Sequence, residues 1–415
     1  MRGTTLSWYL SARTLSTGYH AAVRAFGALR QSLTLRLPLG TPQDACIVVT
    51  PALAGVKSTM KLCFVADANH ANAANWLEYF ATELGHEVHV ISFTQVNREI
   101  NGIILHDLTT RNKLLLLNKI PTLYKLFRQI KPDLVVAYRV QSYGFLTACT
   151  GFHPLILVAQ SRTVVWPPHS KVMAWFCKYA VRHADWILSW AEHTTHRLIE
   201  LGADRSIIDT FPRGVRPELF FPRPKSAASN GPTIITTRSL IPDYKYDEII
   251  HAIHDLIEIM PGVKYQIAGE GKSRAHLEKI VQQLGLNAHV EFLGYVPTVN
   301  LPDRLCEADI YVSAYLEDGV SMSLLEAMAC GLLPIVPDTE PNHMWIQDGV
   351  NGLLFRPGDH VSLVQKLCEA LSNSALHKNA REYNVKFIHE KVNWHTNMRR
   401  IESRFLKILS EFPKH

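Results

Sequence analysis

Two acidic residues flank the start of a predicted helix in the second half of the chain. Residues 318–331 read DGVSMSLLEAMACG and run from a loop into a helix, with Ser323 placed to cap its start and Gly331 its end. Amide groups at a helix N-terminus point toward an anion beside the positive end of the helix dipole, so this segment predicts a diphosphate site. Asp318 lies in the loop eight residues before Glu326. The two carboxylates could therefore bracket one extended ligand and accept hydrogen bonds from sugar hydroxyl groups.

A second interpretation of Glu326 needs no ligand. Ser323 and Glu326 stand three residues apart and match a capping box, in which the glutamate side chain turns back to the start of its own helix. On the residue pattern alone, both interpretations stay open.

Several words of the sequence, taken together, resemble the retaining glycosyltransferases of family 4 (glycosyl transferases group 1), which have the GT-B fold. The signature of that family is E-x7-E, and here it reads D-x7-E, with Asp318 first and Glu326 second. The flanking words are IAGEG at 267–271, FLGYV at 292–296, EADIYVSAY at 307–315, EAMACG at 326–331 and DGVNGLLF at 348–355, with weaker matches in HADWILS at 183–189 and RGV at 213–215. The resemblance covers residues 60–410, is most specific over 230–356, and favours a ligand-binding Glu326.

The resemblance implies a site for a nucleotide-sugar donor. Glu326 would hold the hydroxyl groups of the donor ribose, and Asp318 would hold the transferred sugar near its reacting carbon. Three further sets of residues would contact the sugar, the diphosphate and the base. They are Gly319, Val320 and Ser321 for the sugar, Met322 and Ser323 for the diphosphate, and Gly269, Tyr295 and Val296 for the base.

A departing diphosphate needs positive charge, which two basic residues could supply without a metal ion. Arg238 follows the first predicted strand of the second half, where the family carries its phosphate-binding arginine. The family usually has another basic residue about five positions later, whereas here Lys245 comes seven positions later. Lys245 could still reach the diphosphate, or it could face solvent. The catalytic candidates are thus Arg238, Lys245 and Asp318, and with no D-x-D word at the donor site we expect neither a metal nor another cofactor.

The first half departs further from the family. Asp67, Asn69 and His70 lie in the loop after the first predicted strand, and we expect them on the acceptor side of the site. His70 could contact the acceptor or a phosphate, or it could be an ordinary solvated loop residue. Val136 and Tyr138 stand where many relatives have histidines, and residues 160–162 read QSR where relatives have a GSD word. The acceptor side is therefore expected to be altered or specialised.

Strand and helix patterns alternate twice along the chain, which predicts an α/β protein with two parallel sheets. We expect a GT-B fold of two facing, Rossmann-like, doubly wound domains with a cleft between them. The predicted divisions are an acceptor-side domain at 60–215, a linker rich in turn formers at 216–232, a donor-binding domain at 233–385 and a C-terminal helix at 386–415 that crosses back to the first domain.

Residues 1–59 form a basic extension, with six Lys or Arg side chains and one acid, Asp44. They could be a targeting or membrane-contact arm, or Met60 could be the natural start of the protein, in which case the extension is not part of the native fold. Residues 60–415 are close to neutral, so the overall charge of +6 gives little support to nucleic-acid binding.

The composition favours a cytoplasmic protein. Seven scattered cysteines form no C-x-x-C pair, and no apolar run approaches the roughly 20 residues of a membrane-spanning helix. Between residues 108 and 132 the chain has no acid but several lysines among apolar residues, and Trp166, Trp175 and Phe176 follow. This face could rest on the anionic inner surface of a membrane, or it could be a helix packed on its own sheet.

The resemblance thus implies a hexosyltransferase of cell-envelope polysaccharide biosynthesis. It would move a sugar from a nucleoside-diphosphate sugar to a glycan, a lipid-linked acceptor or a small molecule, with retention of anomeric configuration. Two alternatives share the fold, namely a nucleotide-sugar epimerase and a non-catalytic nucleotide-sugar binding protein. The sequence does not distinguish the base, the sugar, the acceptor or the oligomeric state.

Overall fold

The computed structural model describes residues 59–110, 113–159, 171–225, 231–317 and 319–412. The predicted extension at 1–59 falls outside this range except for its last residue. Asp318 and the QSR word at 160–162 also lie outside it. Within the described ranges, none of the helices has both the length and the apolar character needed to cross a bilayer.

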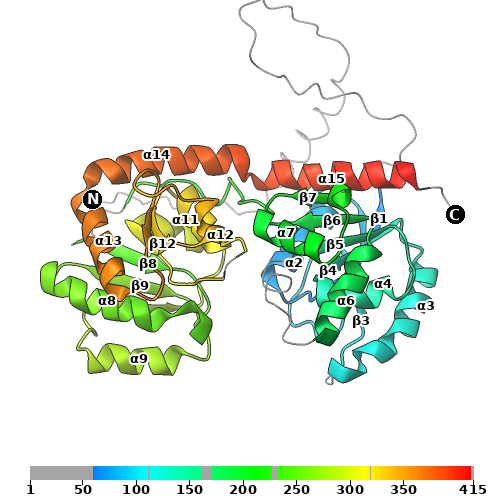
Figure 1. Ribbon diagram of the computed structural model, residues 1–415, viewed down its shortest axis with the longest axis horizontal. Helices are drawn as coiled ribbons and strands as arrows, with labels where there is room; N and C mark the ends of the chain where they lie inside the picture. Colours follow the sequence, from blue (N-terminus) through cyan, green and yellow to red (C-terminus); the bar gives the residue numbers. More distant parts are fainter. Residues whose placement is uncertain (1–58, 111–112, 160–170, 226–230, 318, 413–415) are drawn as a thin grey trace, which may run out of the picture. The chain divides into compact units, whose positions relative to one another are not determined.

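The first half of the fold is a parallel sheet of seven strands in the order β3-β2-β1-β4-β5-β6-β7 (Figure 1). Its strands are β1 (Lys61–Val65), β2 (Glu87–Ser92), β3 (Ile103–Asp107), β4 (Leu134–Tyr138), β5 (Leu155–Ala159), β6 (Trp186–Ser189) and β7 (Ile208–Thr210). The connecting helices include α2 (Ala71–Glu78), α3 (Ile120–Ile130), α4 (Phe145–Ala148), α6 (Lys171–Arg182) and α7 (Glu192–Glu200). β4 and β5 are buried along their whole length, as expected for uninterrupted apolar strands covered on both faces.

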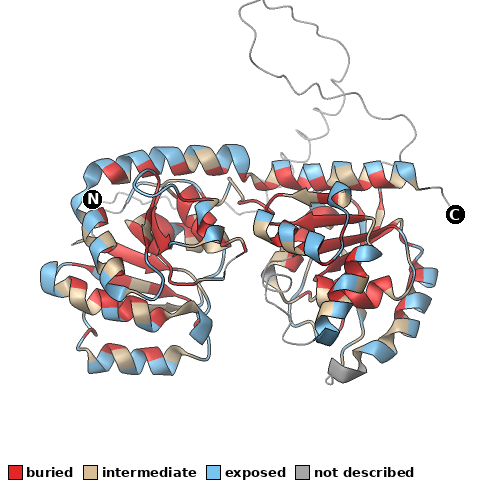
Figure 2. Ribbon diagram, viewed as in Figure 1, coloured by how far each residue is buried: buried red, intermediate tan, exposed pale blue. Residues whose placement is uncertain are grey.

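The second half is a parallel sheet of six strands in the order β10-β9-β8-β11-β12-β13. Its strands are β8 (Thr233–Thr236), β9 (Lys264–Ala268), β10 (Val290–Gly294), β11 (Ile310–Val312), β12 (Leu333–Pro337) and β13 (Leu353–Phe355). The helices are α8 (Tyr246–Ile259), α9 (Arg274–Gln283), α10 (Leu301–Glu307), α11 (Met322–Ala329), α12 (Glu340–His343), α13 (His360–Ser372) and α14 (Ser374–Lys391). The central strands of both sheets are buried, and the helices present buried faces to the sheets and exposed faces to solvent (Figure 2). The predicted pair of Rossmann-like domains is confirmed.

The last helix, α15 (Trp394–Glu411), packs with the first domain. It buries Trp394, Phe405 and three other apolar side chains in the cluster that contains Phe64 and Trp186 of the first sheet. The boundary expected at residues 385–386 falls inside α14, whose buried residues pack with the second domain. The chain passes from one domain to the other at Val392 and Asn393 instead, between the two helices.

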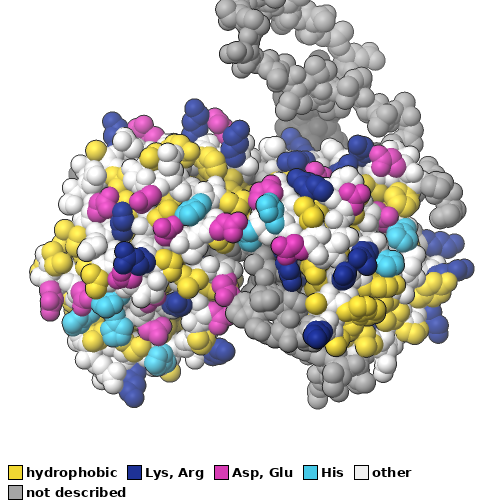
Figure 3. Space-filling model, viewed as in Figure 1, with side chains coloured by type: hydrophobic (Ala, Val, Ile, Leu, Met, Phe, Trp, Pro, Cys, Tyr) yellow, Lys and Arg dark blue, Asp and Glu magenta, His cyan; other side chains and the backbone are white. Residues whose placement is uncertain are grey.

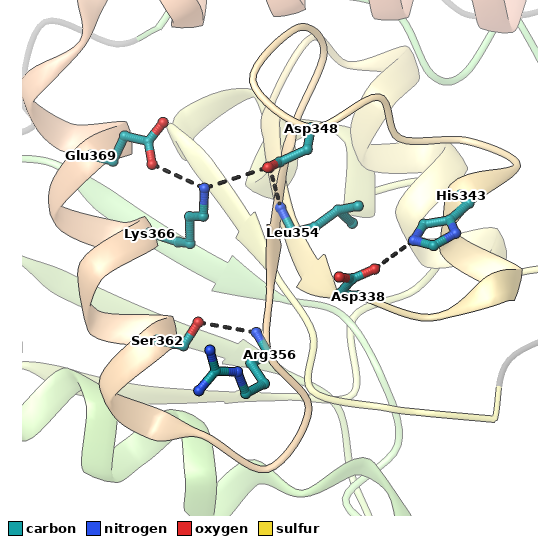
Figure 4. Close-up of polar contacts among 8 residues, drawn as sticks. All are labelled: Asp338, His343, Asp348, Leu354, Arg356, Ser362, Lys366 and Glu369. Atoms are coloured by element: carbon teal, nitrogen blue, oxygen red, sulfur yellow. Dashed lines mark hydrogen bonds and ion pairs between the residues drawn. The ribbon is translucent and has the colours of Figure 1, made fainter.

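The DGVNGLLF word forms a turn that leads into strand β13 and is held by local polar contacts (Figure 4). Asp348 Oδ1 accepts a hydrogen bond from the Leu354 amide at 2.8 Å, and Lys366 Nζ lies 3.6 Å from the second oxygen of Asp348. Beyond the strand, the Arg356 amide donates to Ser362 Oγ at 3.0 Å and fixes the start of α13. The family word is therefore explained here by local folding.

Candidate active site at the start of helix α11

The donor-site candidates gather where the strand order of the second sheet reverses direction. β8 lies between β9 and β11, and all three strands are parallel. Their carboxyl ends therefore meet at one edge, which is where open α/β sheets bind ligands. Arg238 comes two residues after β8, Gly269 directly after β9, and the loop after β11 leads into α11.

The backbone at Arg238 is held from two sides. Tyr246, which is fully buried, donates from its hydroxyl group to the Arg238 carbonyl at 2.7 Å. On the other side, a Cβ added to Gly269 would lie 2.0 Å from the same carbonyl oxygen, so only glycine allows this approach. Gly269 was expected near the base of the donor, and the structure gives it a positioning contact with the Arg238 loop.

The guanidinium of Arg238 is held between two aromatic rings. Its Cζ lies 4.3 Å from the ring centre of Tyr244 and 5.0 Å from that of Tyr315, and the two rings meet edge to face. Cation–π contacts of this kind fix the plane of an arginine without neutralising its charge. Nη1 of Arg238 then donates to Ser321 Oγ at 3.1 Å, which joins the loop after β8 to the start of α11.

Helix α11 begins at Met322, and its N-cap is Ser321 rather than the predicted Ser323. Ser321 Oγ accepts from the Leu324 amide at 3.4 Å, in the geometry of a side-chain cap. Ser323 is turned elsewhere, because its hydroxyl group hydrogen bonds with the buried Tyr311 hydroxyl at 2.8 Å. The amides of Met322 and Ser323 precede the first backbone hydrogen bond of the helix, from Leu325 to Ser321. They stand at the positive end of the helix dipole, beside Arg238.

Glu326 is placed by an arginine that the sequence analysis did not single out. Arg213 Nη2 lies 3.7 Å from Glu326 Oε1, and both side chains are largely buried. Burial raises the pKa of Glu326 to about 7, while the charge of Arg213 acts in the opposite direction. The capping-box interpretation is wrong, because the N-cap is Ser321 and the residue three positions later is Leu324. The one signal that pointed to Arg213 was its place in the RGV word at 213–215.

The acceptor-side candidates lie at the corresponding point of the first sheet, where β1 is flanked by β2 and β4. Asp67 and Asn69 are engaged in joining the loop after β1 to the loop after β2. Asp67 accepts from Thr94 Oγ1 at 2.8 Å, and Asn69 bonds both the Gln95 carbonyl and the Asn97 amide. Asp67 and Asn69 therefore hold the loop after β1 against the loop after β2.

His70 stands at the N-cap of α2, and its Nδ1 is buried. Burial lowers its pKa, and the nearby charges of Arg139 and Arg213 lower it further, while Asp67 raises it. Arg139 directly follows β4 and has a φ of 121°, an unusual value for a residue other than glycine. Arg139 was not predicted as a site residue, because an unusual backbone conformation cannot be recognised from the residue type.

The remaining donor-side candidates are Lys245, Tyr295 and Val296. Lys245 adopts a left-handed conformation, with φ 49°, at the start of α8. Burial raises the pKa of the neighbouring Glu248, and the charge of Lys245 acts in the opposite direction. Tyr295 follows β10 and is 72% exposed, and Val296 comes next in the chain. No cluster of three or more His, Cys, Asp or Glu side chains suited to a metal ion occurs in the part of the chain that the structure describes.

Two segments of the chain match models of known protein families. Residues 61–190 match the model for glycosyl transferase 4-like domains, and residues 220–387 match the model for glycosyl transferases group 1. An exopolysaccharide phosphotransferase of Streptomyces coelicolor is 31% identical over 197 residues, which are 46% of this chain and 20% of that protein. An uncharacterized glycosyltransferase of Methanocaldococcus jannaschii is 23% identical over 317 residues, 74% of this chain and 87% of that protein. The chain thus spans about a fifth of the Streptomyces relative.

Two solved structures share the fold. Sucrose-phosphate synthase of Thermosynechococcus elongatus superposes with a TM-score of 0.71 at 14% identity, over 85% of this chain and 100% of that one. HepE of Anabaena, crystallised with UDP and glucose, gives 0.69 at 16% identity over the same shares. These similarities agree with the two sheets and their strand orders. The chain therefore has the GT-B fold, and its two domains match, in turn, the models for glycosyl transferase 4-like domains and for glycosyl transferases group 1.

Proposed function

We propose that this protein is a family 4 retaining glycosyltransferase that moves a hexosyl group from a nucleoside-diphosphate sugar to an acceptor hydroxyl. The observation that carries the proposal is the contact between Arg238 and Ser321 at the strand-order reversal of the second sheet. It brings one fixed positive charge to the N-terminus of α11, the arrangement that binds a diphosphate. HepE, which has the same fold, was crystallised with UDP, and this supports a nucleotide donor.

In the proposed site, some residues bind the donor and others stabilise the charge that develops during the reaction. Arg238 and the amides of Met322 and Ser323 bind the diphosphate, and Glu326 accepts hydrogen bonds from the ribose. Gly319, Val320, Ser321 and Asp318 hold the transferred sugar, Gly269, Tyr295 and Val296 lie near the base, and Lys245 approaches the diphosphate once a donor is bound. No metal ion is required, since the positive charge comes from the protein.

In the proposed reaction the bond from the anomeric carbon to the diphosphate oxygen breaks while the acceptor oxygen bonds to that carbon on the same face. The acceptor proton passes to the departing diphosphate oxygen, whose growing negative charge Arg238 stabilises. Retention asks for no protein base on the opposite face, which fits a first domain with Val136 and Tyr138 in place of histidines.

The acceptor is a glycan or lipid-linked glycan of cell-envelope biosynthesis, bound beside His70 in the first domain. The protein acts in the cytoplasm as a peripheral membrane protein. Support for membrane contact comes from helix α6, where Trp175 and Val172 are each 55% exposed and Met173 is also exposed. Figure 3 shows hydrophobic side chains gathered over α4 and α6 beside Lys and Arg side chains.

The charged side chains near this surface are positive. Helices α3 and α6 contain no acid, and Lys125, Arg128, Lys171 and Lys178 are exposed on them. The apolar face of α3 itself is packed on its own sheet, with Leu123, Phe127 and Ile130 buried. The exposed apolar residues are therefore those of α6, and α3 adds basic charge that attracts anionic lipid.

Thermal-shift measurements against a panel of UDP-, GDP- and TDP-sugars test the donor proposal. One nucleotide series should raise the melting temperature, and the Glu326→Gln variant should lose most of that shift. A chain that melts at the same temperature with every nucleotide would refute a nucleotide-sugar site. Binding followed by free epimerised sugar would favour an epimerase, and binding without turnover would favour a binding protein.

A further inference from the structure

Arg213 stands where the two chain crossings between the domains pair with each other. The Val215 amide donates to the Val392 carbonyl at 2.7 Å, and the Trp394 amide donates to the Val215 carbonyl at 2.9 Å. Asn397 Nδ2 donates to the Pro212 carbonyl at 2.9 Å. The backbone on both sides of Arg213 is therefore tied to the segment that leads into α15.

Gly214 allows the two crossing segments to approach each other closely. Its φ is 95°, and a Cβ added there would lie 2.7 Å from the backbone of Trp394. A side chain at this position would push the crossings apart, so Gly214 fixes the direction in which Arg213 leaves the backbone.

The side chain of Arg213 is buried and is supported by an aromatic ring. Its Cζ lies 5.6 Å from the ring centre of Trp394, and Arg216 lies over the same ring at 5.1 Å. The residue is 7% exposed, and its Nε has no hydrogen-bond partner. A buried guanidinium needs a compensating charge, and within the described residues the carboxylate within 4.0 Å of it is Glu326.

Few other charges surround this pair. Besides Glu326, the ionisable groups near Arg213 are Arg216 and Tyr138, which act on it, and His70, whose pKa its charge helps to lower. Cys330 lies one turn further along α11, with its amide donating to the Glu326 carbonyl, and its pKa is raised by its neighbour Cys306 and by burial, so that its thiol is neutral. Arg213 is thus the cation that opposes the burial of Glu326.

We propose that Arg213 is a positioning residue for donor binding, which holds the Glu326 carboxylate charged and oriented to accept hydrogen bonds from the ribose. The inference rests on the proposed function, because it assigns a partner to the ribose-binding residue. It also means that the paired crossings between the domains set the donor affinity through one side chain.

The test is the pH dependence of nucleotide affinity, measured by calorimetry between pH 6 and 9 on the full chain. The probe is the nucleoside diphosphate that stabilises the wild type most. Affinity in the wild type should rise as Glu326 ionises around pH 7. In Arg213→Met the rise should move to higher pH, with affinity at pH 7 about tenfold weaker and a smaller loss at pH 9. Arg213→Lys, which keeps a cation, should restore much of the wild-type profile.

Two controls separate this role from a general structural one. Arg216→Met removes the second arginine over Trp394 but no ion pair with Glu326, and its profile should match the wild type. In a Glu326→Gln background, which also reports the ionisation of the nucleotide itself, Arg213→Met should have little further effect. If Arg213→Met does not fold, Arg213→Gln replaces it in the same series.

Uniform weakening at all pH values, or an unchanged profile in Arg213→Met, would overturn the inference and leave the proposed function standing. A wild-type chain that binds no nucleotide would refute the proposed function itself. The two failures are therefore distinguishable.

Discussion

The guanidinium of Arg238 donates to the hydroxyl group of Ser321 at 3.1 Å, across the point where the strand order of the second sheet reverses. Ser321 in turn caps helix α11 by accepting from the Leu324 amide. One hydroxyl group therefore connects the fixed charge to the helix dipole, so that both act on an anion at the same place.

Replacement of Arg238 should affect turnover more than nucleotide binding. Loss of one preorganised charge stabiliser typically costs on the order of a hundredfold or more in kcat. Arg238→Ala should lower kcat by that amount, measured as release of nucleoside diphosphate from the preferred donor. Arg356→Ala, which alters an exposed arginine before α13, is the matched control and should be active. Near-normal turnover in Arg238→Ala would remove Arg238 from the mechanism.

Glu326→Gln should weaken donor binding by about ten- to a hundredfold, because a hydrogen bond to a charged group contributes roughly 1.5–3 kcal/mol. At pH 5, where the Glu326 carboxyl group is protonated, the melting temperature of the free protein should change little, since no capping box is lost. Calorimetric titration with the nucleotide checks the affinity, and Glu369→Gln on the exposed face of α13 is the control. A lower melting temperature with intact affinity would show that Glu326 serves the fold rather than the donor.

The stability of the free protein should depend on pH through Glu326. Its pKa is raised from 4.5 to about 7 in the folded state, so the folded protein binds the proton more tightly than the unfolded chain. The contribution to stability is therefore complete below pH 4.5 and is lost as the pH rises through 7, with a total of about 3 kcal/mol. Urea unfolding of wild type and Glu326→Gln at pH 5 and pH 8 checks this sign. A difference between the two proteins that stays constant or moves the other way would contradict the buried carboxyl group.

Exposed Trp175 should contribute to membrane contact. Trp175→Ser should reduce sedimentation with vesicles that contain anionic phosphatidylglycerol, because an interfacial aromatic side chain is lost. Ile259→Ser is the matched control, since Ile259 is 61% exposed on α8 in the second domain. Wild-type binding should weaken with added salt. Equal sedimentation with neutral and anionic vesicles, or no sedimentation at all, would contradict the proposed membrane face.

The sequence predicted the fold well where burial is uniform. β4 and β5 are continuous apolar runs whose composition predicts buried strands, whereas β3 is an edge strand on which Ile104 and Leu105 are exposed. β7 has three residues and leaves no periodic pattern. Edge strands and very short strands depend on their neighbours, and their own sequence says little about them.

The site was predicted less completely, for reasons of tertiary contact. The sequence predicted Ser323 as the N-cap of the helix. In the structure, the hydroxyl group of Ser323 hydrogen bonds with that of Tyr311 on strand β11, and Ser321 is the N-cap. Arg213 reaches Glu326 because of the pairing of Val215 with Val392 and Trp394. Contacts between residues more than a hundred positions apart cannot be read from local spacing.

The most direct test of glycosyl transfer with retention is the stereochemistry of the product, followed by NMR in the presence of EDTA. With the preferred nucleotide sugar as donor and methanol as the simplest acceptor hydroxyl group, the product is a methyl glycoside whose anomeric centre does not interconvert in water. A retaining transfer should slowly form a methyl glycoside with the same anomeric configuration as the donor, α from an α-linked donor. Formation of the inverted glycoside would contradict it.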